Sequence, residues 1–507
     1  MRSNNHSGRR SMKFALTMLA VALSLGAGCG DKKKKTNDPG GGGGGVHNPS
    51  DPSTAPAQAK AEFAEVAKRY EAAKKNGSLS KGTCEDLSKA FEAVYKQYGA
   101  AMAVAKFNAG AVWEECGDVE RAEKIYQDLV SEVPKYDLAY NNLGVIYWNR
   151  KQEGRALDFF KKAVDANATT RAPRNNLAAA LRDKYANNPQ QSDFEAAEKQ
   201  LQTVLAVDSG NRLAYENLAR LYYDRGRLKD KSYLLLADLV VTQAIRVLSD
   251  AKQESADIYN IKGLLFMEDD NQVEALRAFK RAVEIKKNHT DANMNIAMIA
   301  IRFRDYKSAE ESIGIALKDG RQKKNVEAYL GLGVALRGQR KYGDAESAFK
   351  KALDVKSSDP RALYNLGILY HEHIGPETER KNDTGNFDKK PYEKAKDYFD
   401  KFVSQSSGKK ELEKYAADAK NRIANINDYF KNIEEMKKLE AEAKKLEEQA
   451  KKAEEEEKNR LLKMEEDLRK QQGGGGDAAP PADKPADKPA DKPADKPADK
   501  AAAKPSK

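Results

Sequence analysis

Apolar residues recur along the chain with a helical spacing that repeats about every 34 residues. The stretch 326–359 shows the unit best. Its first predicted helix carries Tyr329, Leu332 and Leu336 on one face, and its second carries Ala345, Phe349 and Ala352. Gly333 and Ala345 lack bulk, so the two helices can approach closely where they cross. One such pair cannot bury its apolar faces alone, so neighbouring pairs must stack on it.

The same spacing starts again at residues 103, 137, 171, 212, 256, 290, 326 and 360. The second clearest copy carries Tyr140, Leu143, Gly144, Tyr147, Ala156, Phe160 and Ala163. An aromatic residue, Leu-Gly, Tyr and Ala-x3-Phe at these offsets resemble the tetratricopeptide repeat (TPR) family. The resemblance implies an all-α solenoid of about eight helix pairs over 103–409. Extra residues at 187–192, 225–231 and 374–390 are predicted to form insertions or loops between helices.

The N-terminus has the pattern of a secretory signal peptide over residues 1–28. Basic residues precede a twelve-residue apolar run, 14–25, which is too short for a transmembrane helix. Small residues then lead directly to Cys29. This arrangement resembles the lipobox of bacterial lipoproteins, which implies cleavage before Cys29 and its acylation, although Gly26 stands where a branched residue is usual. The alternative is an ordinary secreted protein with a stray cysteine.

Charge argues against a nucleic-acid partner. The whole chain has a net charge of +11, and residues 29–507 retain 85 basic against 78 acidic residues, or +7. The charges are interspersed, and no basic stripe is paired with stacking aromatic residues.

The segments between the signal and the repeats are predicted from composition and spacing. Residues 29–56 are rich in Lys, Gly and Pro and are predicted to be a disordered tether. Residues 57–102 are predicted to form N-terminal capping helices, the first over 57–75.

Cys84 and Cys116 are candidates for a disulfide. Each lies 16 residues from Ala100, where the turn of a helical hairpin is predicted, so the two cysteines would lie level with each other. Export to an oxidising compartment favours the bridge. The alternative is two buried free thiols.

The C-terminal segment 410–472 is predicted to be a capping helix that passes into a long charged helix. A heptad stripe is formed by Met436, Leu439, Ala443, Leu446, Ala450 and Ala453, and Glu457 and Arg460 then break it. The stripe permits self-association through 433–453. The alternative is a lone solvated helix held by Glu–Lys pairs. Residues 473–507 start with four glycines, continue with repeated Pro-Ala-Asp-Lys and are predicted to be a disordered spacer.

No catalytic constellation, metal site or cofactor site is evident from the residues. His371 and His373 are two apart, so on a helix they point to different faces and cannot chelate one metal from one side. We therefore expect a protein that is not an enzyme and that has no cofactor.

Partner binding is expected on the concave face that the first helices of a TPR solenoid line. The asparagines that precede the Leu-Gly position form a predicted peptide-binding ladder of Asn108, Asn142, Asn176, Asn217, Asn295 and Asn365. Trp148 and Tyr223 are candidate anchors in an apolar and acidic half of the groove, which favours an apolar or basic internal segment. The alternative is that the asparagines bond only within the solenoid.

The layout resembles the outer-membrane TPR lipoproteins of myxobacterial gliding-motility complexes. That resemblance implies a lipid-anchored scaffold at the outer membrane, facing the periplasm and binding envelope proteins. Two alternatives remain: an assembly lipoprotein for an outer-membrane pore or pilus secretin, and a periplasmic chaperone for unfolded clients.

Overall fold

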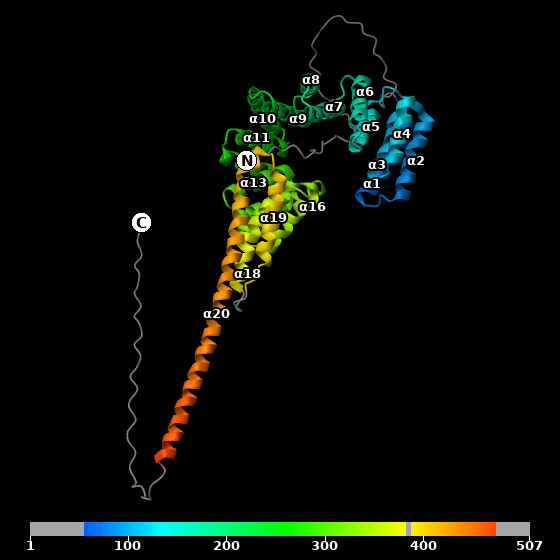
Figure 1. Cartoon of the computed structure of the whole chain (residues 1–507). Helices are drawn as coiled ribbons and strands as arrows, with labels where there is room; N and C mark the ends of the chain where they lie inside the picture. The colour runs from blue at the N-terminus through cyan, green and yellow to red at the C-terminus, as the bar shows by residue number, and fades with distance from the viewer. Residues whose placement is uncertain (1–54, 382–386, 473–507) are drawn as a thin grey trace, which may run out of the picture. The chain divides into compact units, whose positions relative to one another are not determined.

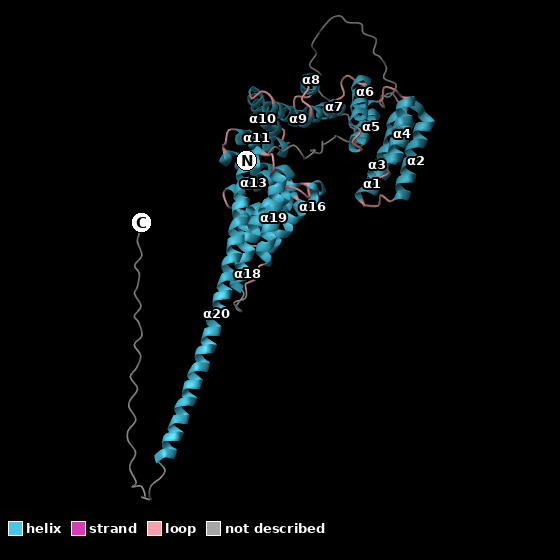
Figure 2. Cartoon of the chain, viewed as in Figure 1, coloured by secondary structure: helices cyan, strands magenta, loops and turns pink. Residues whose placement is uncertain are grey.

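The computed structural model of the chain describes residues 55–381 and 387–472 and is helical, with no strand among those residues (Figures 1 and 2). The predicted signal peptide, Cys29, nearly all of the tether and the tail from 473 lie outside the described residues. The chain divides into a first compact unit that ends at Ile423 and a second that begins at Ala424.

Eight helix pairs make up most of the first unit. The first helices of the pairs are α3 (Ala103–Glu115), α5 (Asp137–Asn149), α7 (Ala172–Asn187), α9 (Arg212–Leu228), α11 (Ala256–Glu268), α13 (Thr290–Arg302), α15 (Val326–Gly338) and α17 (Pro360–Leu369). The second helices are α4 (Val119–Glu132), α6 (Glu153–Ala166), α8 (Gln191–Val207), α10 (Ser232–Asp250), α12 (Gln272–Ile285), α14 (Tyr306–Ala316), α16 (Tyr342–Val355) and α19 (Lys390–Ser406). Each first helix begins within one residue of its predicted start, so the all-α solenoid is confirmed.

In most of the helix pairs, a glycine of the first helix packs against an aromatic ring of the second helix. A Cβ atom added to Gly144 would overlap the ring of Phe160, and one added to Gly333 would overlap the ring of Phe349. Gly110, Gly263 and Gly367 stand in the same relation to Tyr126, Phe279 and Phe399. These rings are fully buried. The glycine of the Leu-Gly pair therefore leaves the space on the first helix that the aromatic ring of the second helix occupies.

The insertions expected at 187–192 and 225–231 lie partly within helices, with short non-helical links at 188–190 and 229–231. α7 continues to Asn187 and α8 already begins at Gln191, while α9 continues to Leu228. The extra turn of α9 is held by packing, because the Arg225 guanidinium lies 4.2 Å from the ring centre of Phe194. Part of the expected loop at 374–390 is also helical, since a π-turn (η4, Tyr370–Ile374) leads into α18 (Gly375–Lys381).

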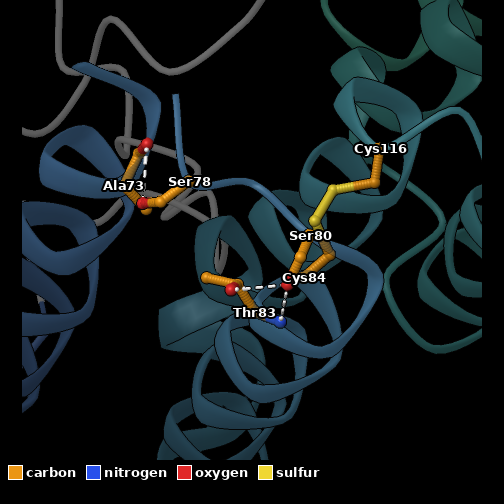
Figure 3. Close-up of a disulfide and its surroundings, with 6 residues drawn as sticks. All are labelled: Ala73, Ser78, Ser80, Thr83, Cys84 and Cys116. Atoms are coloured by element: carbon orange, nitrogen blue, oxygen red, sulfur yellow. Dashed lines mark hydrogen bonds between the residues drawn. A yellow bond between two sulfur atoms is a disulfide. The ribbon is translucent and has the colours of Figure 1, made fainter. Parts of the chain in front are cut away.

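Two helices cap the N-terminal end of the solenoid. α1 (Ala57–Lys75) and α2 (Lys81–Tyr98) lead through a 3₁₀ turn, η2 (Gly99–Met102), into α3. Cys84 near the start of α2 and Cys116 at the end of α3 form a disulfide with their Cα atoms 6.5 Å apart (Figure 3). The Ser80 hydroxyl caps α2 by accepting a bond from the Thr83 amide at 3.2 Å, as Figure 3 shows.

The start of α20 (Glu413–Gln472) caps the other end. Within the first unit, Tyr364 of α17 donates a hydrogen bond to Asp418 at 2.7 Å, and Arg422 pairs with Glu372 at 2.7 Å. Leu412 and Ala419 are buried. From 434 to 471 every residue of the same helix is exposed, and this part belongs to the second unit.

One helix of the described residues, α10, is long and apolar enough to cross a membrane by length and composition. Ala237, Val241, Ala244 and Leu248 of that helix are buried in the core of the solenoid. They recur at helical spacing, as in the other second helices. This burial accounts for one apolar face of α10, and Leu235 and Leu239 remain exposed on its surface.

Candidate partner-binding face

The first helices line up side by side in two runs, and the surface that they present is here called the first-helix face. α5 contacts α7, α7 contacts α9 and α9 contacts α11. α13, α15 and α17 contact one another in the same sequential manner. Stacked repeats create extended binding surfaces in this way, because each repeat adds one helix to the same side.

Asparagine side chains join neighbouring repeats along this face. Asn176 donates a hydrogen bond to Asn141 Oδ1 at 2.7 Å, and Asn295 donates one to Asn260 Oδ1 at 3.0 Å. Each bond spans 35 residues of sequence, which is one repeat. Asn142 donates to Glu114 Oε2 and to the Tyr126 hydroxyl, both at 3.1 Å. The amides therefore connect successive repeats inside the stack.

The burial of these amides divides the predicted ladder into two groups. Asn108, Asn142 and Asn176 are at most 2% exposed, so they cannot reach a partner's backbone while the solenoid is closed. Asn217, Asn295 and Asn365 are half-buried. Of these, Asn217 accepts a bond from Arg182 and Asn365 accepts one from Arg337, so the alternative of bonds within the solenoid describes the contacts of both groups.

The two predicted anchors differ in accessibility. Trp148 is half-buried on α5. Tyr223 is only 3% exposed, and its hydroxyl donates a bond to Glu268 at 3.1 Å. The guanidinium of Arg220 lies 5.5 Å from the Tyr223 ring centre. Tyr223 is thus held inside the solenoid, and a partner can reach only Trp148 of the pair.

Two acidic residues of the groove, Asp183 and Asp224, are paired with arginines. Arg182 contacts Asp183 at 2.8 Å, and Arg220 contacts Asp224 at 3.2 Å. Burial raises the pKa of Asp183, and Arg182 opposes that rise. Burial works against the charge of Arg182, but Asp183 and Asp224 outweigh it and raise its pKa. Because the acids are neutralised locally, this part of the face is not an open acidic field. The spacing of Arg220 and Asp224, four apart on one helix, was the available signal.

Exposed positions on the first-helix face are both apolar and polar. Met298 of α13 is 45% exposed, and Asn149 of α5 is exposed. Such a surface can take apolar side chains and satisfy backbone groups of a bound segment.

The two histidines of η4 lie in different surroundings. His373 stacks on Tyr342 with ring centres 5.1 Å apart, whereas His371 meets the ring of Phe399 edge-on. Burial lowers the pKa of both. Among the described residues, no group of three or more His, Cys, Asp or Glu side chains is placed to hold a metal ion.

Four segments of the chain, 114–170, 190–230, 294–353 and 334–373, match the family model of the tetratricopeptide repeat. The chain therefore contains tetratricopeptide repeats (TPRs) in these segments. Repeats of this kind generally mediate protein–protein interaction and the assembly of complexes, and their stacked fold is typically non-catalytic.

The similarity to curated proteins covers only part of this chain. It is 21% identical over 271 residues to the human protein O-mannosyl-transferase TMTC3, covering 46% of this chain and 29% of the relative. It is 24% identical over 143 residues to the photosystem I assembly protein Ycf3 of Synechococcus sp. (strain CC9605), covering 28% of this chain and 62% of that protein. The chain therefore spans less than two thirds of the length of each of these two relatives.

A solved structure of Pseudomonas aeruginosa pilF aligns with 45% of this TPR protein and 94% of its own chain, at 16% identity and a TM-score of 0.37. The structure of YrrB, described as a TPR protein with an unusual peptide-binding site, aligns with 40% of this chain and 96% of its own, at 21% identity and a TM-score of 0.29.

Proposed function

We propose that this TPR protein is a lipid-anchored, non-catalytic scaffold of a bacterial cell envelope. It binds partner proteins on the first-helix face and organises a multiprotein machine at the outer membrane, with gliding motility as the specific setting. The observation that carries the proposal is the side-by-side packing of the first helices from α5 to α11 and from α13 to α17, because a surface built from successive repeats can hold an extended partner or several partners side by side.

Export and anchoring are supported by two independent features. The first 28 residues have the order of a signal peptide that ends at Cys29. The Cys84–Cys116 disulfide suits an oxidising compartment such as the periplasm. Residues 29–56 then act as a tether between an acylated Cys29 and the capping helices.

The binding mode follows from the accessible part of the face. The buried asparagines hold the repeats in register, and exposed side chains such as Met298 and the half-buried Trp148 meet the partner. An extended, largely uncharged internal segment fits this mixture better than a basic segment, since Asp183 and Asp224 already have arginine partners.

The binding proposal is tested by comparing Met298→Glu with Val273→Glu in the full chain. Met298 is 45% exposed on a first helix, and Val273 is 57% exposed on the second helix α12. Both variants place the same carboxylate on an exposed position. Met298→Glu should reduce the recovery of cross-linked envelope partners by about tenfold, and Val273→Glu should leave it unchanged. Equal recovery with both variants would contradict the first-helix face as the binding surface.

Anchoring is tested separately with Cys29→Ala. The unaltered protein should incorporate a fatty-acid label and sediment with outer membranes, whereas the variant should incorporate no label and move to the soluble periplasmic fraction. Label at an unchanged level in Cys29→Ala would refute the anchor.

A role as assembly lipoprotein for an outer-membrane pore or pilus secretin is the second candidate, and the relative that is named an assembly protein favours it. Deletion of the protein would then lower the amount of one oligomeric pore. A periplasmic chaperone would instead bind a broad range of unfolded clients and suppress their aggregation. A scaffold co-purifies with one stable set of partners.

A further inference from the structure

The second unit carries an apolar stripe that is longer than its heptad pattern. Beyond Ala453 the heptad meets Glu457 and Arg460, but apolar residues resume at Leu461, Met464 and Leu468. When Glu457 is counted as the stripe position between Ala453 and Leu461, the spacings from Ala450 onward are three, four, four, three and four, which corresponds to one four-residue insertion in the heptads. On a helix with about 100° per residue, all positions from Met436 to Leu468 in this series fall within an arc of about 100°.

The stripe is exposed along its whole length. Its large apolar side chains are between 52% and 66% exposed, namely Met436, Leu439, Leu446, Leu461, Met464 and Leu468. The helix does not bury them against itself, and every residue from 434 to 471 is exposed. An apolar face of about 48 Å on a single helix has the dimensions of a coiled-coil seam.

We propose that this stripe is covered by a second copy of the same chain, packed antiparallel about a centre near Lys452. This self-association goes beyond the proposed scaffold function and does not depend on it. In the antiparallel register Met436 faces Leu468, Leu439 faces Met464 and Ala443 faces Leu461. Large side chains therefore meet near the two ends of the seam, and the alanines Ala450 and Ala453 meet at its centre, where the helices can approach closely.

The charges beside the stripe favour this orientation. On its two flanks the register places opposite charges together: Lys438 with Asp467, Glu442 with Arg460, Glu447 with Lys458, and Lys451 with Glu454. Each of these pairs occurs twice in a symmetric dimer. Glu440 with Glu465 is the one like-charge pair at corresponding flank positions.

Glu457 favours the antiparallel over the parallel arrangement. It lies on the stripe itself, so a parallel pair in register would bring two Glu457 carboxylates together in the seam, which is costly for like charges. In the antiparallel pair the two carboxylates are apart, and each faces Leu446 of the other copy. A single polar residue in an apolar seam fixes register at some cost in stability.

The first experiment compares two neighbouring leucines of nearly equal exposure. Leu461 lies on the stripe and is 60% exposed, while Leu462 lies off it and is 54% exposed. Sedimentation equilibrium of the purified protein should show twice its monomer mass. Leu461→Gln should raise the dimer dissociation constant by at least about tenfold, and Leu462→Gln should change it by less than about twofold. A monomer at concentrations on the order of 100 µM, or equal effects of the two substitutions, would overturn the proposal.

The second experiment determines orientation with two single substitutions, Ala443→Cys and Leu461→Cys. In the antiparallel dimer these positions face each other, whereas two copies of the same position are about 27 Å apart along the helix. Mild oxidation of the mixed variants should therefore give a disulfide-linked dimer that neither variant forms alone. Cross-linking of each variant with itself would overturn the antiparallel arrangement. No cross-link in any sample would overturn pairing through this helix.

Discussion

The solenoid and the second half of α20 are built on the same spacing of apolar residues, yet they use it differently. In the repeats, Phe349 and its counterparts are fully buried, and their rings pack against the glycines of the first helices. In the long helix, Leu446 has the same helical periodicity and is 66% exposed. Periodicity thus decides which face of a helix is apolar, but only a partner surface decides whether that face is buried.

The stabilising interactions differ accordingly. The repeats gain from buried rings and from amide bonds between repeats, such as Asn176 to Asn141. The long helix has exposed ion pairs four residues apart, such as Lys451 with Glu447 at 2.8 Å. Exposed pairs of this kind contribute little to stability. The isolated helix is therefore only weakly stabilised, and its apolar stripe is exposed to solvent.

The largest difference should come from truncating one apolar side chain in each region. Phe279→Ala removes a ring that is 0% exposed and should lower the free energy of unfolding by about 3–5 kcal/mol. Leu446→Ala should lower it by less than about 0.5 kcal/mol at concentrations where the chain is monomeric. Urea unfolding followed by circular dichroism measures both. Equal losses would show that the long helix is buried within the monomer.

The disulfide should have the next largest effect, confined to the N-terminal end of the solenoid. Replacing both Cys84 and Cys116 with Ser should destabilise α1, α2 and α3 by about 2–4 kcal/mol, because the bridge closes a loop with a sequence separation of 32. Hydrogen exchange should show faster opening of these helices and unchanged amides in residues 434–471. Unchanged protection of α2 would contradict a stabilising bridge.

A smaller, pH-dependent effect is expected at the link between α14 and α15. The Arg321 side chain and amide donate bonds to Asp319, and Thr290 donates another at 3.0 Å. The Arg321 bond lowers the pKa of Asp319 from 3.8 to about 2. Since the folded pKa lies below the unfolded one, the contribution is complete above about pH 4 and is lost as pH falls towards 2.

After allowance for solvent screening, this contribution is about 1 kcal/mol or less. Comparing the acid unfolding of the unaltered chain with that of Asp319→Asn measures it, because the variant should lack this part of the pH dependence. Identical acid profiles would exclude a role for Asp319 in stability at low pH.

The smallest effect should come from the exposed ion pairs of the long helix. Glu447→Gln removes the charge that faces Lys451, and both side chains are more than 60% exposed. At concentrations where the chain is monomeric, the helix should lose less than about 0.5 kcal/mol, and high salt should abolish the difference. Helicity measured at low and high ionic strength checks this. A larger, salt-independent loss would indicate that the pair is buried in an interface.

Local patterns predicted most of the fold. Tyr329, Gly333 and Phe349 recur at offsets that mark each helix pair, so the eight starts could be placed before the structure was known. The position of Cys84 relative to Cys116 was also predictable, because equal distances from one turn bring two residues level in a hairpin. The additional turn of α9 could not be predicted in this way, because the contact of Arg225 with Phe194 joins residues in different repeats.

The contacts of the predicted groove depend on residues that are distant in the sequence. An asparagine at one helical position is expected to point towards the concave side, but whether its amide is free depends on the next repeat, and Asn141 already accepts the bond of Asn176. Likewise the Asn217 amide oxygen accepts a bond from Arg182, which lies 35 residues earlier in the sequence. The sequence alone determined the helices, their faces and the repeat, because these depend on neighbours within one or two turns. The tertiary structure decided which polar groups are satisfied and which apolar face stays open, because those depend on contacts between residues a whole repeat apart or more.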